Sequence, residues 1–201
     1  MKIGFVGAGN VASNLGTLFS AAGHEVKYAT PNPKEGQLSI PEVCDYGTVV
    51  CFAIPFEAMK EVLTDNAEAL AGKIVIDITN AIHLKDWSPI FLGEDSGAEQ
   101  ASRLVPKSKV VKAFNTIFAD VMHPEKQKIS GQKLTCFIAS DDLEALEIVE
   151  QLSREAGFHS VAIKGLNNAR HLEAMAHLNI TIALGGGGTT AGFAYLQSER
   201  T

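Results

Sequence analysis

The chain has 201 residues, of which 46% are hydrophobic, and it carries a formal net charge of −6. This size and composition are typical of one globular domain with a well-buried core, and they leave too little chain for two domains of ordinary size. The negative charge argues against nucleic acid or an anionic membrane surface as a partner, and three cysteines without a CxxC pair argue against a disulfide framework or a zinc site.

Short apolar segments alternate with segments of helical periodicity along the N-terminal half of the chain. Lys2–Val6 is an apolar run that predicts a buried strand, and residues 10–22 place an apolar side chain on each helical turn before Gly23. Thr30–Ser39 is polar and proline-containing, so we expect a loop there. The other predicted elements of this half are strands at Glu25–Ala29, Thr48–Ile54 and Lys73–Ile78 and a helix at Phe56–Leu70.

The same alternation continues to the C-terminus. The predicted strands here are Lys109–Phe114, Lys133–Ala139 and His159–Ile163, and the predicted helices are Ala98–Leu104, 141–156 and Asn168–Leu184. We expect the two lysines of the Lys109–Phe114 strand, Lys109 and Lys112, to lie at solvated ends. Alternating strands and helices predict an α/β doubly wound fold with a mostly parallel sheet. Residues 1–165 would form this domain, and residues 166–201 would add a C-terminal helix and a short glycine-rich tail.

A glycine motif connects the first predicted strand to the first predicted helix. Residues 7–12 read G-A-G-N-V-A, in the strand–turn–helix context of a dinucleotide-binding βαβ unit. Gly7 allows a tight turn, Gly9 lets a pyrophosphate approach the backbone, and Ala12 lets the helix pack closely on the strand. The alternative is a glycine turn without a ligand. The motif predicts a Rossmann NAD(P)-binding fold with cofactor contacts from Gly7, Ala8, Gly9, Asn10, Val11 and Ala12.

The end of the second predicted strand bears on the choice between NADP and NAD. An acidic residue there accepts hydrogen bonds from the ribose of NAD, but this sequence has Thr30-Pro31-Asn32-Pro33-Lys34. Thr30 and Asn32 can donate hydrogen bonds to a 2′-phosphate, and Lys34 supplies a positive charge. The segment therefore favours NADP, with NAD as the other possible cofactor. A solvated lysine without a ligand role is the alternative for Lys34.

The carboxyl ends of the central strands should line the ligand cleft. Polar residues follow these strands directly and could orient a carboxamide or an acceptor ring, although ordinary loop positions would explain them as well. The candidate cofactor-binding residues at these ends are Ala53, Ile54, Pro55, Thr79, Asn80, Ala113 and Asn115.

The motifs of the chain resemble those of a known family over nearly its whole length. They are GAGNVA at 7–12, NPK at 32–34, AGKIVIDITN at 71–80, VVKAFNTIFA at 111–120 and LNNARHLEAM at 166–175. With them the chain resembles the NADP oxidoreductases that depend on coenzyme F420, a deazaflavin. It is also similar to the cytosolic reductase domain of the six-transmembrane epithelial antigen of prostate metalloreductases. The family often has Ser-Arg ahead of Asn-Pro-Lys, whereas this chain has Thr30 and Pro31, which leaves Lys34 to contact a 2′-phosphate.

This resemblance implies direct hydride transfer between NADP and a flavin or F420-type ring. Such a transfer needs no catalytic side chain and no metal, because alignment of the two rings supplies the rate. One alternative is a reductase of a small carbonyl or imine compound, which would need a proton donor such as His83 or His123. Another is a non-enzymatic NADP sensor, or a subunit that presents NADP to a partner.

Several C-terminal features carry further expectations. Arg170, Glu173 and His177 share a helical face, which predicts a polar surface or a subunit contact, with an acid–base or metal site as the alternative. The long apolar last helix suggests a homodimer.

Residues 185–196 contain Phe193 and other apolar side chains, so we expect them to pack near the cleft or across a dimer interface rather than to form a disordered tail. We expect a cytoplasmic protein with a small-molecule acceptor, with its cysteines buried and reduced.

Overall fold

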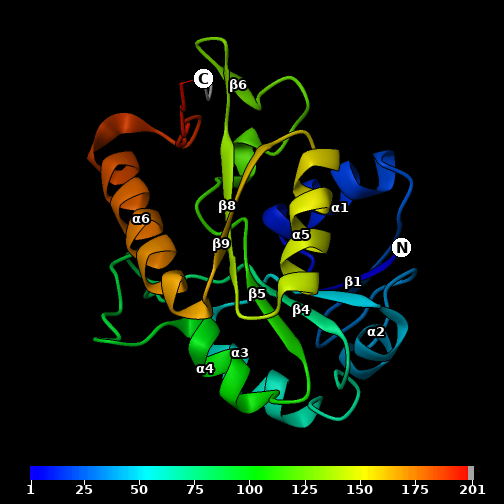
Figure 1. Cartoon of the computed structure of the whole chain (residues 1–201). Coiled ribbons are helices and arrows are strands. Elements are labelled where there is room, and N and C mark those ends of the chain that lie inside the picture. Colours follow the sequence, from blue (N-terminus) through cyan, green and yellow to red (C-terminus); the bar gives the residue numbers. More distant parts are fainter. Residues whose placement is uncertain (199–201) are drawn as a thin grey trace.

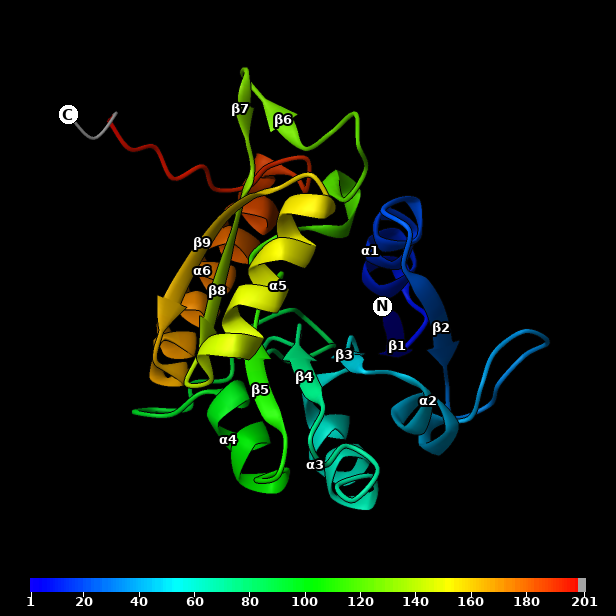
Figure 2. The same cartoon turned by 45° about the vertical axis from the view of Figure 1, so that its right-hand side comes forward.

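The computed structural model describes residues 1–198, and its centre is a seven-stranded sheet in the order β2-β1-β3-β4-β5-β8-β9 (Figures 1 and 2). Every neighbouring pair is parallel except β5 with β8. The predicted doubly wound, mostly parallel sheet is therefore confirmed. The strands are β1 (Lys2–Val6), β2 (Glu25–Ala29), β3 (Val49–Phe52), β4 (Ile74–Asp77), β5 (Lys109–Lys112), β8 (Thr135–Ser140) and β9 (His159–Lys164).

Helices cover both faces of the sheet. Successive strand side chains point to opposite faces, so Val49 and Cys51 pack toward α1 (Asn10–Ala21) and α5 (Leu143–Glu155). Val50 and Phe52 pack in a second cluster with α2 (Ile40–Tyr46), α3 (Phe56–Asp65) and α4 (Gly97–Leu104). This arrangement explains why the strands read as continuous apolar runs, as expected for a sheet buried on both faces.

The three cysteines lie inside these apolar clusters, as predicted for Cys51 and Cys136. Cys44 is buried in the second cluster. Burial raises the pKa of the Cys44 and Cys136 thiols to about 12. Both thiols therefore stay protonated at neutral pH and act as small apolar side chains.

One helix, α2, was not predicted from the sequence. It begins with a capping box in which the Glu42 carboxylate accepts hydrogen bonds from the backbone N–H of Ser39 at 2.8 Å and from the Ser39 hydroxyl at 2.6 Å. The Ser39-Ile40-Pro41-Glu42 sequence is the signal that could have located it. A small hairpin of β6 (Lys128–Ile129) and β7 (Gln132–Lys133) was also missed.

Several predicted element ends are wrong by a few residues. The β5 strand stops at Lys112 rather than Phe114, because Phe114 has a φ of 62° that no strand residue adopts. The α3 helix ends at Asp65 rather than Leu70, and the chain continues in turns. The predicted strand at Lys133–Ala139 begins only at Thr135, because Lys133 belongs to the hairpin.

The prediction that both lysines of β5 lie at solvated ends is wrong for Lys112. Lys109 is partly exposed and forms ion pairs with Asp142 and Glu144, whereas the side chain of Lys112 is 0% exposed. Lys112 points to the face of the sheet opposite Val111, where acidic side chains from other elements surround it. Sequence periodicity does not reveal such partners, because they are distant along the chain.

The last helix, α6 (Ala169–Ile182), lies beside β8 and β9, and the chain then turns back (Figure 1). A wide turn at Ala183–Gly187, in which Gly186 has a φ of 101°, ends the helix two residues before the predicted Leu184. Beyond it the Thr135 N–H donates to the Phe193 carbonyl at 2.8 Å, and the Tyr195 N–H donates to the Thr135 hydroxyl at 2.9 Å. This part of the segment thus packs against β8 of the sheet, whereas the prediction placed residues 185–196 near the cleft or across a dimer interface. No helix among the described residues is long and apolar enough to cross a membrane.

Candidate functional site

The glycine motif forms an open turn at the carboxyl end of β1. Gly7 has a φ of 110°, and a Cβ atom there would lie 2.3 Å from the Ala53 carbonyl oxygen that follows β3. A Cβ atom at Gly9 would meet nothing within 4 Å. No side chain therefore blocks the approach to the N-terminus of α1, where the first N–H groups lack helical partners and favour negative charge. Ala12 is fully buried, as close packing of helix on strand requires.

The loop after β2 lies beside this turn, because the Gly7 N–H donates to the Ala29 carbonyl at 2.9 Å. Gln37 organises the loop: its Oε1 accepts from the Thr30 hydroxyl at 3.2 Å and from the Lys34 N–H at 3.0 Å. Asn32 and Lys34 are exposed. The loop thus presents the side chains of Asn32 and Lys34 next to the glycine turn. Thr30 holds the loop through its hydrogen bond to Gln37.

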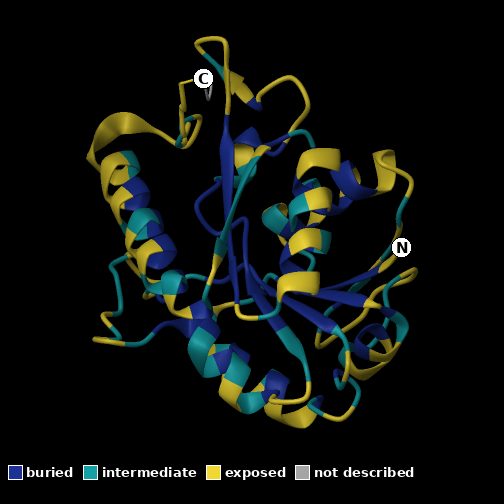
Figure 3. Ribbon diagram, viewed as in Figure 1, coloured by how far each residue is buried: buried dark blue, intermediate teal, exposed yellow. Residues whose placement is uncertain are grey.

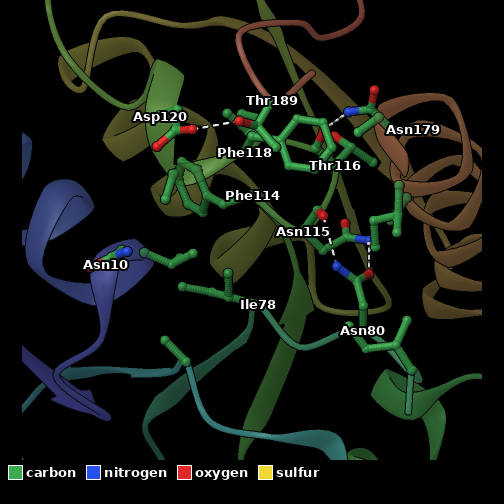
Figure 4. Close-up of a pocket in the computed structure, with 18 of the residues that line it drawn as sticks. Asn10, Ile78, Asn80, Phe114, Asn115, Thr116, Phe118, Asp120, Asn179 and Thr189 are labelled. Carbon is green, nitrogen blue, oxygen red and sulfur yellow. Dashed lines mark hydrogen bonds between the residues drawn. The ribbon is translucent and has the colours of Figure 1, made fainter. Parts of the chain in front are cut away.

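A cavity of about 540 Å³ lies at the carboxyl ends of the central strands, between the glycine turn, the loop after β5 and helix α6 (Figure 4). This is where a doubly wound sheet places its ligand. The lining residues come from distant parts of the chain. They include Gly9, Asn10, Val11, Ala12, Ala53, Ile78, Asn80, Trp87, Phe114, Asn115, Thr116, Phe118, Asp120, Ala176, Asn179, Ile180, Leu184 and Thr189.

Asn80 and Asn115 meet at the floor of this cavity and bind each other (Figure 4). The Asn115 Nδ2 donates to Asn80 Oδ1 at 3.0 Å and to the Leu172 carbonyl at 3.0 Å, while Asn80 Nδ2 donates to the Asn115 carbonyl at 2.9 Å. Both Nδ2 partners are acceptors, so the orientation of the Asn115 amide is fixed. Its Oδ1 is the one buried side-chain polar atom within residues 1–198 that has no hydrogen-bond partner.

Aromatic side chains form much of the cavity wall. Trp87, Phe114 and Phe118 all line it. Trp87 and Phe114 both have a φ of 62°, a backbone conformation that typically costs on the order of 1–3 kcal/mol for a bulky residue and is concentrated at functional sites. The cavity therefore offers flat apolar surfaces and amide groups, which suit a planar heteroaromatic ligand.

One ionisable side chain, Asp120, is found among the residues that line the cavity. Its carboxylate accepts a hydrogen bond from the hydroxyl of Thr189, which belongs to the segment after α6 (Figure 4). Asn179 of α6 donates to the Thr116 carbonyl at 3.2 Å. The C-terminal segment thus forms part of the cavity wall, which sequence reasoning placed near the cleft without naming these residues.

Some predicted site residues lie outside this cavity. The Thr79 hydroxyl donates to the Met59 sulfur at 3.6 Å and faces the interior, and Ala113 is fully buried. Seven predicted residues do line the cavity: Gly9, Asn10, Val11, Ala12, Ala53, Asn80 and Asn115. The other predicted residues outside its lining are Gly7, Ala8, Thr30, Asn32, Lys34, Ile54 and Pro55.

The three residues of the predicted polar face of α6 each bind a different partner. Arg170 pairs with Glu99 of α4, and His177 Nε2 lies 2.9 Å from the Ala81 carbonyl. Glu173 is buried and pairs with Lys112 at 2.9 Å, so the prediction of a polar surface is wrong at this residue. In the described part of the chain, no three His, Cys, Asp or Glu side chains are grouped so that they could hold a metal ion. His83 and His123 are exposed and do not line the cavity.

Comparisons with known proteins agree with the motifs. Residues 2–81 match the family model described as NADP oxidoreductase, coenzyme F420-dependent. The chain is 30% identical to metalloreductase STEAP3 of Rattus norvegicus over 87% of this chain and 36% of that protein. It is 26% identical to the F420-dependent NADP reductase of Methanothermobacter thermautotrophicus over 90% of this chain and 89% of that protein.

A solved structure shows the same similarity in three dimensions. It is described as a candidate F420-dependent NADP reductase of Arthrobacter sp. FB24, with a TM-score of 0.88, 26% identity, and coverage of 98% of this chain and 100% of that one. The chain spans about a third of the length of the metalloreductases that it matches. The resemblance that the motifs indicated is confirmed.

Proposed function

We propose that this chain, a relative of the F420-dependent NADP oxidoreductases, is an NADP-dependent oxidoreductase that transfers a hydride between NADP and a flavin or deazaflavin ring. The names of its relatives support the coarse class. The observation that carries the finer proposal is the aromatic cavity beside the glycine turn, which is lined by Asn115, a residue whose buried Oδ1 has no hydrogen-bond partner. The nicotinamide and the acceptor ring would both lie in this cavity, since it borders the turn that would hold the pyrophosphate.

The polar groups of the cavity fit this reaction. An unpaired buried carbonyl typically costs about 1–3 kcal/mol, which a ligand N–H would offset. A carboxamide NH₂ of nicotinamide or a ring N–H of a flavin is such a donor. Hydride transfer moves two electrons and a proton from nicotinamide C4 to the acceptor ring, and any further proton comes from solvent. The protein then contributes alignment, for which fixed amides and flat aromatic walls are suitable.

The alternatives receive less support from the cavity. Reduction of a carbonyl or imine needs a nearby proton donor. The histidines proposed for this role, His83 and His123, do not line the cavity, and the ionisable residue that does, Asp120, accepts a hydrogen bond from Thr189. A non-enzymatic sensor would bind NADPH without turnover. Activity measurements separate these possibilities from the main proposal.

The test is an acceptor screen with a matched pair of variants. NADPH and NADH oxidation is measured with riboflavin, FMN, FAD, F420 and ferric chelates. We expect turnover with flavin-type rings and expect Asn115→Ala to lower kcat/KM by at least about tenfold. The control is Asn66→Ala, which removes a side-chain bond to the Val62 carbonyl, and neither of these residues lines the cavity. Absence of turnover with every flavin-type ring, or full activity of Asn115→Ala, would refute the proposal.

A further inference from the structure

A buried cluster of charges lies behind the cavity and takes no direct part in the proposed reaction. Lys112 Nζ is 2.9 Å from Asp77 Oδ2, 2.9 Å from Glu173 Oε1 and 2.6 Å from the Thr79 carbonyl oxygen. The exposed fractions of the lysine and aspartate side chains are 0% and 1%. Glu173 Oε2 also accepts from the Gly97 N–H at 3.1 Å, and Asp77 Oδ1 accepts from the Thr79 N–H at 2.8 Å.

One cation of the cluster, Lys112, binds two acidic side chains. Burial by itself would lower the pKa of Lys112, but Asp77 and Glu173 outweigh this effect and raise the pKa. The three donors of the ammonium group match three acceptors. Burying such ions is costly, and an apolar side chain at the same place often stabilises a fold as well or better. Stability alone therefore does not account for the cluster.

The location of the cluster connects it with the cavity. Asp77 ends β4, Lys112 ends β5, and Glu173 lies on α6. The residue before Glu173 supplies the Leu172 carbonyl that accepts from Asn115 Nδ2 and so fixes the amide. The two turns after Glu173 supply the α6 part of the cavity wall, which consists of Ala176, Asn179 and Ile180.

From this geometry we propose that the Lys112–Glu173 ion pair positions α6 against β5, so that the Asn115 amide and the α6 wall hold the nicotinamide and the acceptor ring in contact. Both residues are positioning residues, because neither lines the cavity. A charge-assisted hydrogen bond adds a directional constraint to the apolar packing of α6. The inference rests on the proposed function only for the identity of the acceptor.

A second ion pair provides a matched control. Arg170, one turn before Glu173 on α6, binds Glu99 of α4 with bonds of 2.8 and 2.7 Å. This pair joins the same helix to α4, but it is partly exposed, and neither of its residues lines the cavity. Substitution of Arg170 therefore removes one ion pair of α6 and leaves the buried Lys112–Glu173 pair intact.

The experiment compares Glu173→Ala and Glu173→Gln with Arg170→Ala, at a temperature well below each melting point. With riboflavin as acceptor, we expect the Glu173 variants to lose about tenfold or more in kcat while the NADPH Kd stays within about twofold. The isotope effect with NADPH deuterated at C4 should increase, because hydride transfer becomes slower. Glu173→Gln keeps the shape and should retain more activity than Glu173→Ala. Arg170→Ala should match the wild type.

A fluorescence measurement tests the positioning without any acceptor. Trp87 is the single tryptophan of the chain and lines the cavity, so energy transfer from Trp87 to bound NADPH reports the geometry there. We expect this transfer to change in the Glu173 variants and not in Arg170→Ala. Unchanged transfer and kcat in stable Glu173 variants, or equal effects of Arg170→Ala, would overturn the inference. If the wild type shows the fluorescence signal but no turnover with any flavin-type ring, the proposed function fails and the fluorescence comparison alone decides the positioning.

Discussion

Single side chains near the glycine turn should separate the affinity for NADP from the affinity for NAD. Lys34 is exposed in the loop beside this turn, and the proposed NADP complex places it near the 2′-phosphate. A charge contact with a phosphate at such a partly exposed position is typically worth about 1–2 kcal/mol. We therefore predict that Lys34→Ala weakens NADP binding about tenfold and leaves NAD binding almost unchanged, as measured by titration calorimetry.

Gly9→Val is the matched comparison for this prediction. Its added side chain finds open space in the protein alone, so the fold should persist. In the complex it would occupy the place of the pyrophosphate, so both cofactors should bind at least about tenfold more weakly. Equal losses of NADP and NAD in Lys34→Ala, or tighter binding of NAD by the wild type, would contradict the NADP preference. Unchanged affinities in a folded Gly9→Val would contradict the pyrophosphate site.

At the scale of one element, the segment after α6 joins the cavity to the sheet. Thr189 binds Asp120 at the cavity, and Phe193 packs with Phe137 and Leu172. We predict that truncation after Leu184 retains NADPH binding and loses most riboflavin turnover, because it removes one wall of the cavity and leaves the glycine turn intact. Steady-state kinetics and calorimetry on the same preparation would measure both quantities.

A point variant distinguishes the contribution of the Thr189–Asp120 hydrogen bond at the cavity from that of the apolar packing of this segment. Thr189→Val keeps the volume of the side chain and removes its bond to Asp120. It should lose part of the turnover with no change in melting temperature. If the truncated chain keeps full activity with riboflavin, the segment has no role in the acceptor site.

At the scale of the whole molecule, exposed residues lie along the outer side of α6 (Figure 3). Leu178 and Ile182 are one turn apart and 54% and 50% exposed, and Leu184 follows at 63%. We propose that a second copy of the chain covers this surface and that the protein is a homodimer, since an exposed apolar patch of this kind typically marks an interface. We predict that the double variant Leu178→Asp, Ile182→Asp sediments as a monomer where the wild type sediments as a dimer.

The control for the dimer is Leu143→Asp. Leu143 is similarly exposed, at 52%, but it lies at the start of α5 rather than on α6. This variant should leave the sedimentation coefficient unchanged. A wild-type chain that sediments as a monomer at micromolar concentration would exclude the dimer, and dissociation by Leu143→Asp would place the interface elsewhere.

The sequence by itself determined the class of fold and the region of the site. Short apolar runs and helical periodicity depend on neighbours along the chain, so the alternating elements of a doubly wound sheet could be predicted from them. The glycine motif is equally local, because a turn, a backbone approach and a helix N-terminus follow one another directly. Since the carboxyl ends of parallel strands meet at one edge, Asn80 and Asn115 could be expected in the cleft together.

Only the tertiary structure decided which groups meet across the chain. Lys112 resembles a solvated strand end in the sequence, yet it is buried, because Asp77 and Glu173 approach it from another strand and from the last helix. The Leu172 carbonyl of that helix likewise accepts a hydrogen bond from Asn115 Nδ2. This bond fixes the orientation of the amide and leaves its Oδ1 without a partner. The pattern of apolar residues along the chain cannot predict such contacts, because the energy of a buried charge or amide depends on partners that only the folded chain brings within hydrogen-bond distance.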